Sequence, residues 1–170
     1  MKPDVTNVVI AGLGGQGVLK ASDILADAAF LAGLDVKKSE IHGMSQRGGS
    51  VTSDVRFGGR VLSPMVPAGE ADFLVVLAED QVEVNRPALR AGGVLLPVTL
   101  VDEAALANRR SINVALLGAL SAQLDIDEAA WLQAVRANLP EKLHAVNEQA
   151  FAIGKAAARA PREGPGGANP

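Results

Sequence analysis

A glycine-rich segment near the start of the chain could bind a phosphate group. Residues 12–17 read Gly-Leu-Gly-Gly-Gln-Gly and fit the G-x-G-x-x-G pattern, between a predicted strand and a predicted helix. Glycines permit a tight turn, and a helix start offers unpaired backbone amides to an anion. The segment also fits a tight strand-to-helix turn that holds no ligand. Its candidate binding residues are Gly14, Gly15, Gln16 and Gly17.

A polar loop over residues 39–50 gathers a second set of chemically capable side chains. His42 and Glu40 could form an acid–base pair, whereas a lone histidine between Ile and Gly is more often a structural hydrogen-bonding residue. Arg47 could present its guanidinium to a carboxylate, a phosphate or a partner subunit. Ser45 has no base and no nucleophile elbow around it, so no catalytic residue is predicted. The candidate binding residues of this loop are Arg47, Gly48, Gly49 and Ser50.

The end of the second predicted strand tests whether the glycine segment binds a dinucleotide. An NAD site usually places Asp or Glu there, about 20 residues beyond the turn, to hold the ribose hydroxyls. This chain has Val36-Lys37-Lys38, and Glu40 could serve only if the strand runs further. The lysines would suit a phosphate or be solvated charges. A free-standing NADP-binding oxidoreductase therefore stays an alternative, although one domain leaves little room for a substrate domain.

Composition excludes several classes of protein. The chain has 170 residues, which suits one domain, and no Cys, which excludes disulfides, thiolate nucleophiles, thiolate zinc sites and ordinary iron–sulfur clusters. The two histidines, His42 and His144, are far apart in sequence, and we predict no metal site. A net charge of -3 and an aromatic content of 3% disfavour nucleic acid. Without a signal-peptide leader or an apolar run of about 18 residues, we expect a cytoplasmic location and no membrane contact.

Hydrophobic patterns place these loops in an α/β fold. We expect a single Rossmann-like domain over residues 1–160, with a mostly parallel sheet, a β-hairpin insertion and a helical C-terminal part. Its first strand, helix and second strand form a βαβ unit. Residues 161–170, with three prolines and three glycines, are expected to be a disordered tail. The predicted strands are 5–11, 34–38, 72–77 and 94–98, with a hairpin of 51–57 and 60–62 through Gly58-Gly59; the predicted helices are 18–32 ended by Gly33, 80–90 closed by Gly92-Gly93, 112–122, 128–139 capped by Asp127, and 141–159 started by Pro140.

The two glycine-rich motifs, in this order, resemble the gamma subunit or gamma domain of 2-oxoacid:ferredoxin oxidoreductases. The second motif reads Ser-Glu-Ile-His-Gly-Met-Ser-Gln-Arg-Gly-Gly-Ser-Val over residues 39–51, and its form is similar to the beta subunit of indolepyruvate ferredoxin oxidoreductase. Gamma chains that act on pyruvate or 2-oxoglutarate tend to have a different lead-in to the arginine. The likeness extends from Asn7 to about Gly154 and includes Asp72, Asn113, Gly118 and Asn147.

This resemblance implies a heteromeric complex that oxidatively decarboxylates a 2-oxoacid, forms a coenzyme A thioester and reduces ferredoxin. Such a complex uses thiamine diphosphate, magnesium and iron–sulfur clusters. The chain has neither cysteines nor the Gly-Asp-Gly segment with an Asn pair that marks a thiamine diphosphate site. We therefore expect no cofactor held by this chain alone, and a partner subunit that carries the catalytic centre.

The expected role is that of an accessory subunit, inactive in isolation. Its work would be assembly, and the Gly14 to Gly17 turn with the Arg47 loop could shape the entrance for coenzyme A or the 2-oxoacid. The motif favours indolepyruvate or another aryl 2-oxoacid, with pyruvate or 2-oxoglutarate as alternatives. A pure scaffold that binds no small molecule is a further alternative. Isolated, the chain could self-associate through an apolar face that the partner covers.

Overall fold

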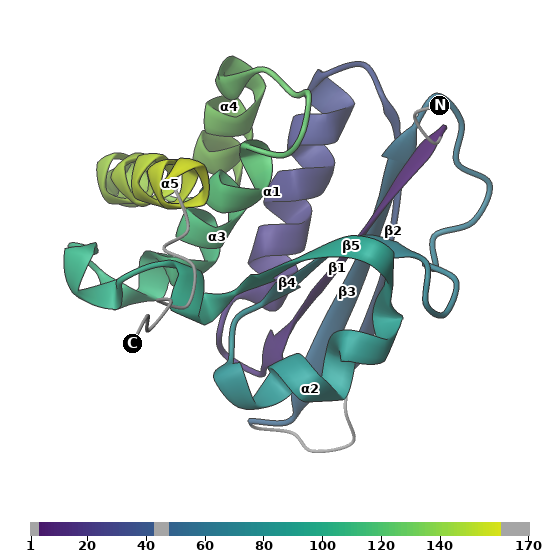
Figure 1. The fold of residues 1–170 in the computed structure, drawn as a ribbon. Helices are drawn as coiled ribbons and strands as arrows, with labels where there is room; N and C mark the ends of the chain where they lie inside the picture. Colours follow the sequence, from purple (N-terminus) through teal and green to yellow (C-terminus); the bar gives the residue numbers. More distant parts are fainter. Residues whose placement is uncertain (1–3, 43–47, 161–170) are drawn as a thin grey trace, which may run out of the picture.

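A five-stranded sheet in the order β2-β3-β1-β4-β5 runs through the structure, a computed structural model that describes residues 4–42 and 48–160 (Figure 1). β1 pairs in parallel with β4, and β4 with β5, whereas β3 is antiparallel to both β1 and β2. The predicted α/β class is confirmed, with a mixed rather than mostly parallel sheet. The strands are β1 (Val5–Leu13), β2 (Asp35–His42), β3 (Ser50–Gly58), β4 (Ala71–Val76) and β5 (Leu89–Pro97).

The predicted hairpin is wrong in its second strand. Residues 60–62 form no strand, and β3 instead makes its hairpin with β2. β3 also lies between β1 and β2, so the two strands of the predicted βαβ unit are not neighbours. The alternation in β3 correctly shows a buried face, on which Val55 and Phe57 pack into the core. Alternation reports which face is buried but does not identify the neighbouring strand.

The long helices follow the predicted ranges closely. Their ends differ from prediction by at most three residues. The largest difference is at the start of the last helix, where the first predicted residues form a 3-10 turn, Glu141–Leu143. Gly33, with φ of 83°, ends the first helix as predicted. Asp127 occupies the expected N-cap position, but its carboxylate makes no capping hydrogen bond. The helices are α1 (Val18–Leu31), α3 (Ile112–Ser121), α4 (Glu128–Asn138) and α5 (His144–Arg159).

The predicted helix over residues 80–90 is broken into short pieces. A 3-10 turn precedes α2 (Val82–Asn85), and a second one, Arg86–Ala88, contains Pro87, which lacks the amide hydrogen that a continuing helix needs. β5 then begins at Leu89, five residues earlier than predicted. The Gly92-Gly93 pair therefore lies inside a strand with an irregular register, instead of closing a helix.

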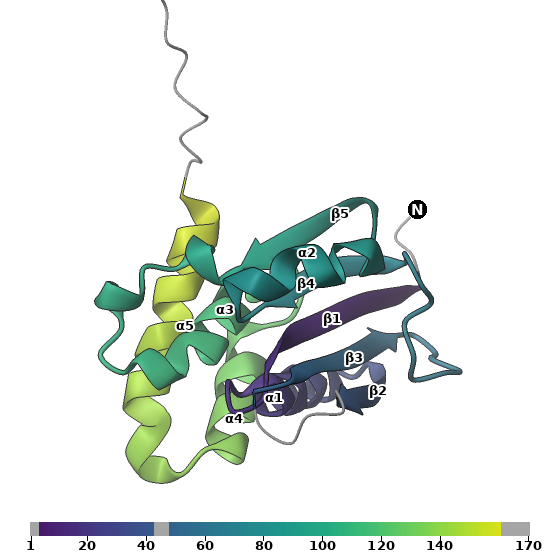
Figure 2. The same cartoon turned by 90° about the horizontal axis from the view of Figure 1, so that it is seen from below.

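The two faces of the sheet are covered unequally (Figures 1 and 2). The four long helices lie on one face. There Leu25, Leu116 and Trp131 of the helices belong to the same main core as Ile10 of β1. The other face carries only a small cluster of buried strand residues, against which α2 and its flanking turns pack. None of the described helices is long and apolar enough to cross a membrane. The predicted tail, residues 161–170, lies outside the described residues.

Helices α3 and α5 cross with their backbones almost in contact. A Cβ atom added to Gly154 would lie 1.6 Å from the carbonyl oxygen of Ala115, and one added to Gly118 would lie 2.0 Å from that of Phe151. Only glycine fits at such a crossing. This contact fixes the position of α3, and with it Asn113, the α3 residue that contacts the glycine-rich turn.

Candidate functional site

The glycine-rich turn connects the carboxyl end of β1 to the start of α1. Gly15 and Gly17 have φ angles of 89° and 84°, in the left-handed region that favours glycine. The turn is closed by Gln16, whose side-chain Oε1 accepts a 2.7 Å hydrogen bond from the Leu13 amide. The Gln16 amide in turn donates to the Leu13 carbonyl at 3.2 Å. Gln16 thus stabilises the shape of the turn.

The start of α1 has no intramolecular cap from a side chain. Gly17 is the N-cap residue, and the first hydrogen bond within the helix runs from the Ala21 amide to the Gly17 carbonyl at 2.9 Å. The amides of residues 17–20 therefore have no helical acceptor. No acidic residue lies in the first turn, so the positive end of the helix dipole is not compensated there.

Asn113 holds the turn in place from α3. Its Nδ2 donates to the Gly17 carbonyl at 3.2 Å, and its Oδ1 accepts from the Val114 amide at 2.9 Å. The side chain is buried, with the residue 7% exposed. A Cβ atom at Gly17 would lie 2.5 Å from Asn113 Nδ2, so a side chain there would displace the Asn113 amide from its present position.

The second glycine-rich segment lies directly beside the first. The Gly14 amide donates to the Gly49 carbonyl at 2.9 Å. Ser50, at the start of β3, donates from its hydroxyl to Oε1 of Gln81 at 2.7 Å. The structure therefore brings Gly48, Gly49 and Ser50 to the glycine turn. Arg47 and Ser45 lie outside the described residues, and His42 ends β2.

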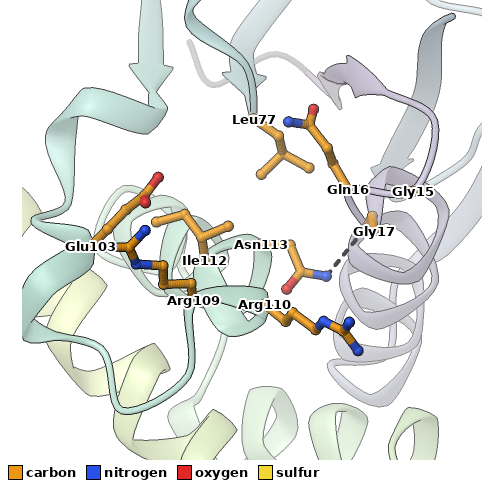
Figure 3. Close-up of a pocket in the computed structure, with 9 residues that line it drawn as sticks. All are labelled: Gly15, Gln16, Gly17, Leu77, Glu103, Arg109, Arg110, Ile112 and Asn113. Atoms are coloured by element: carbon orange, nitrogen blue, oxygen red, sulfur yellow. Dashed lines mark hydrogen bonds between the residues drawn. The ribbon is translucent and has the colours of Figure 1, made fainter. Parts of the chain in front are cut away.

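Two pockets flank the turn and share Gly15 and Gly17. One, of about 450 Å³, also contains Arg109, Arg110 and Asn113, and we name it the arginine pocket (Figure 3). The other, of about 410 Å³, is lined by Leu13, Leu19, Val51 and other residues, and we name it the apolar pocket. The two pockets adjoin at Gly15 and Gly17, near the carboxyl end of β1, and we name the pair the groove.

The loop before α3 presents the two arginines. Arg109 and Arg110 begin a 3-10 turn, Arg109–Ser111, which the side chain of Asn108 caps by accepting from the Arg110 amide at 3.0 Å. Both arginines are exposed, and neither forms an ion pair with any described residue. The sequence interpretation missed these arginines because their segment is far from the turn along the chain. The hydrogen bond from neighbouring Asn113 to Gly17 spans 96 residues.

The lysines considered for an NADP phosphate are engaged elsewhere. Lys38 donates to Asp23 of α1 and, at 2.8 Å, to Glu40. Burial opposes the charge on Lys38, but these two carboxylates outweigh it and raise the pKa of the ammonium group. The Nζ atom of Lys37 lies 3.8 Å from Oδ1 of Asp35. β2 is also separated from β1 by β3, so its residues do not flank the turn as they would in a dinucleotide site.

A metal site is not evident in the described part of the chain. There, no group of three or more His, Asp or Glu side chains is placed to hold a metal ion. The groove therefore offers backbone amides, guanidinium groups and apolar side chains. Such a set suits an elongated anion with an apolar portion.

Comparison with known proteins assigns the chain to a family. Residues 7–102 match the family model described as pyruvate ferredoxin/flavodoxin oxidoreductase. The chain is 35% identical to the indolepyruvate oxidoreductase subunit IorB of Thermococcus kodakarensis, over 90% of this chain and 96% of the relative. It is also similar to the gamma subunit of keto/oxoacid ferredoxin oxidoreductase from Geobacter sulfurreducens, with a TM-score of 0.78, 26% identity, and coverage of 92% of this chain and 99% of that one.

A second solved structure contains the same fold within a longer chain. The 2-oxoglutarate:ferredoxin oxidoreductase from Magnetococcus marinus aligns with a TM-score of 0.79 and 22% identity. The match covers 96% of this chain but 32% of that one. At this identity the likeness shows the fold alone. The fold thus occurs both as a separate subunit and as one part of a larger polypeptide.

Proposed function

Since this chain belongs to the pyruvate ferredoxin/flavodoxin oxidoreductase family, we propose that its complex oxidises an aryl 2-oxoacid, with indolepyruvate as the first candidate. The chain is an accessory subunit of a 2-oxoacid:ferredoxin oxidoreductase and works beside catalytic subunits. The aryl substrate is supported by the name of the relative from Thermococcus kodakarensis and by the form of the motif at residues 39–51.

The cofactors of this reaction belong with the catalytic subunits. Complexes of this family depend on thiamine diphosphate and iron–sulfur clusters. When bound, thiamine diphosphate supplies the carbanion chemistry of decarboxylation, and the clusters carry the electrons away. This chain has no cysteine to ligate a cluster, so we propose that it is inactive in isolation.

We further propose that the groove over the glycine turn receives coenzyme A. The observation that carries this proposal is the meeting of two pockets at Gly15 and Gly17, where the helix start is uncapped and two arginines have no described partner. Backbone amides and guanidinium groups would bind phosphates, and the groove would orient the thiol toward the catalytic subunit. In this role the chain would bind the phosphates of coenzyme A and would contribute no catalytic side chain.

The first experiment reconstitutes the complex from this chain and its catalytic subunit. We expect oxidation of indolepyruvate, dependent on coenzyme A and coupled to reduction of ferredoxin, with a kcat/KM higher than for pyruvate or 2-oxoglutarate. The catalytic subunit alone and this chain alone are the controls. A preference for pyruvate or 2-oxoglutarate would overturn the aryl assignment without affecting the family.

The alternative functions predict different results from the isolated full chain. A free-standing NADP-dependent enzyme would bind NADPH tightly and transfer a hydride by itself. A pure scaffold would lose assembly, and nothing else, when the glycine turn is altered. We expect no tight NADPH binding in a calorimetric titration, because the candidate lysines are already paired with carboxylates.

A further inference from the structure

The two faces of the sheet differ in where large apolar side chains reach solvent. Among the described residues, no exposed one belongs to α3, α4 or α5 on the first face, and two lie at the end of α1. The other four belong to the second face, against which α2 packs: Ile41 of β2, Leu62 and Met65 of the loop between β3 and β4, and Val84 of α2. A partner that covers the second face would therefore bury apolar surface there.

The loop between β3 and β4, residues 59–70, crosses the second face, and we name it the strap. It is the blue-teal loop at the right of Figure 1. Two carboxylates on neighbouring strands hold it by accepting from its backbone. The Val61 amide donates to Oδ2 of Asp35 on β2 at 2.7 Å, and the Val66 amide donates to Oδ2 of Asp54 on β3 at 2.9 Å.

Two further side chains hold the strap through its carbonyl groups. Arg56 of β3 donates from Nη1 to the Ser63 carbonyl at 2.9 Å, and Asn7 of β1 donates from Nδ2 to the Glu70 carbonyl at 3.1 Å. The strap is therefore tied to β1, β2 and β3 along its length. It is a fixed element of the structure, although its residues form neither helix nor strand.

The strap presents two apolar side chains on its outer side. Val61 is buried and Val66 packs against the small cluster of the second face, whereas Leu62 is 79% exposed and Met65 is 53% exposed. Two prolines within the strap further restrict its backbone. A partner that binds such a fixed ridge has little loop entropy to overcome, so the exposed leucine suits an anchor in a partner's pocket.

A free guanidinium group lies next to this ridge in sequence. Arg60 is exposed and forms no hydrogen bond or ion pair with any described residue. A surface complementary to the strap would therefore combine an apolar recess with a carboxylate at its rim.

A second copy of this chain does not offer that surface. A two-fold contact would place the strap of one copy against the strap of the other and bring the two Arg60 side chains together. Four pockets of about 410 to 820 Å³ lie on the described residues, and none of them includes a residue of the span 60–66 that could receive Leu62. The complex to which this chain belongs also contains catalytic subunits, whose surface differs from its own.

We infer that the strap docks on the catalytic subunit, with Leu62 anchored in an apolar pocket and Arg60 facing a carboxylate at the rim of that pocket. The inference rests on membership of a heteromeric complex, and neither on the aryl substrate nor on the coenzyme A groove. Asn7, which holds the end of the strap, lies near the amino end of β1, whereas the groove lies at the carboxyl end. The docking surface is thus separate from the groove.

The test measures the dissociation constant between the purified full chain and its catalytic subunit. Leu62→Ala should raise this Kd about tenfold or more, because the leucine side chain loses its burial in the complex. Phe30→Ala is the matched control, since Phe30 is 72% exposed at the end of α1, and it should leave the Kd unchanged. Thermal unfolding of each variant checks that it remains folded.

The charged contact has its own signature. Arg60→Gln should raise the Kd several-fold at low salt, and the difference from the unaltered chain should shrink as the salt concentration rises, because salt screens an exposed ion pair. A difference that does not depend on salt would contradict the carboxylate at the rim.

The role of the fixed backbone is tested at its first anchor. Asp35→Ala removes the acceptor of the Val61 amide, so hydrogen exchange at that amide should become faster and the Kd should rise several-fold. Asp35→Asn keeps an acceptor oxygen and should restore both values. Faster exchange without any change in Kd would show that docking does not need a fixed strap.

Two results would overturn the inference. One is a Kd that is the same for Leu62→Ala, Phe30→Ala and the unaltered chain. The other is a Leu62→Ala variant that binds the catalytic subunit normally but no longer self-associates in isolation, because the strap would then contact a second copy. Errors in the proposed substrate or coenzyme A site would alter the kinetics of the complex without changing these Kd values, so the failures are distinguishable.

Discussion

Two regions of this chain depend on glycine for opposite physical reasons. At the crossing of α3 and α5, Gly118 and Gly154 are required because another backbone occupies the space of a Cβ atom. At the turn between β1 and α1, the space beside Gly15 is empty, and glycine is favoured there by a positive φ. The crossing is closed and serves stability, whereas the turn is open and leaves its backbone accessible to a ligand.

Gly17 belongs to both types. It has a positive φ, and its missing Cβ also makes room for Asn113, a residue of the helix that the crossing positions. The close packing of α3 against α5 therefore supports the floor of the groove. The tightly packed α3–α5 pair thus supports the open turn between β1 and α1, as expected for a site built on rigid elements.

The largest expected effect comes from the crossing. Gly154→Ala should destabilise the domain by roughly 3 kcal/mol or more, because the new methyl group overlaps the Ala115 carbonyl and the helices must separate. Urea unfolding of the isolated full chain measures this. Ala152→Gly, at an exposed position of the same helix, is the control and should cost about 1 kcal/mol at most. Similar losses for the two variants would show that the crossing is not tight.

An intermediate effect is expected at Gly17. Gly17→Ala should cost about 2 kcal/mol, from the left-handed backbone and from the clash with Asn113. In a double-mutant cycle, Asn113→Ala should remove the clash, so the two losses of unfolding free energy should add up to more than the loss of the double variant. Strict additivity would mean that Asn113 does not press on this position.

The sharpest contrast is between Gly15 and Gly33. Both have a positive φ and open space for a Cβ atom, so Gly15→Ala and Gly33→Ala should each cost about 1–2 kcal/mol of stability. Only Gly15 lies in the groove, and only its variant should raise the KM for coenzyme A in the reconstituted complex. An equal change in KM for both variants would remove the functional distinction between turn and helix end.

The smallest effect is expected where β3 joins the site. Ser50→Ala removes the hydrogen bond to Gln81 and should cost about 1 kcal/mol, since the buried Gln81 loses one partner. Ser63→Ala, at an exposed position of the loop after β3, serves as the control. Chemical denaturation of both variants gives the difference, and a loss of several kcal/mol would show that the turn region depends on this single contact.

Local patterns predicted the parts of the fold that depend on local physics. Helical spacing predicted α1, α3 and α4 closely, because the apolar stripe of a helix repeats within the segment itself. The helix over residues 80–90 failed because Pro87 and a strand beginning at Leu89 interrupt it. The hairpin failed because alternation in β3 is equally compatible with any antiparallel neighbour.

The sequence by itself determined the family and the α/β class, since the glycine-rich motifs and the hydrophobic patterns are each read from contiguous residues. The absence of cysteine likewise determined that this chain ligates no ordinary iron–sulfur cluster. Only the tertiary structure decided which groups surround the turn. Asn113 hydrogen-bonds the turn across 96 residues of sequence, and Arg109 and Arg110, just before it in the chain, line the same pocket. The close crossing of α3 and α5 holds Asn113 at the turn. Their role depends on packing between distant segments, and no periodicity or spacing along the chain encodes it.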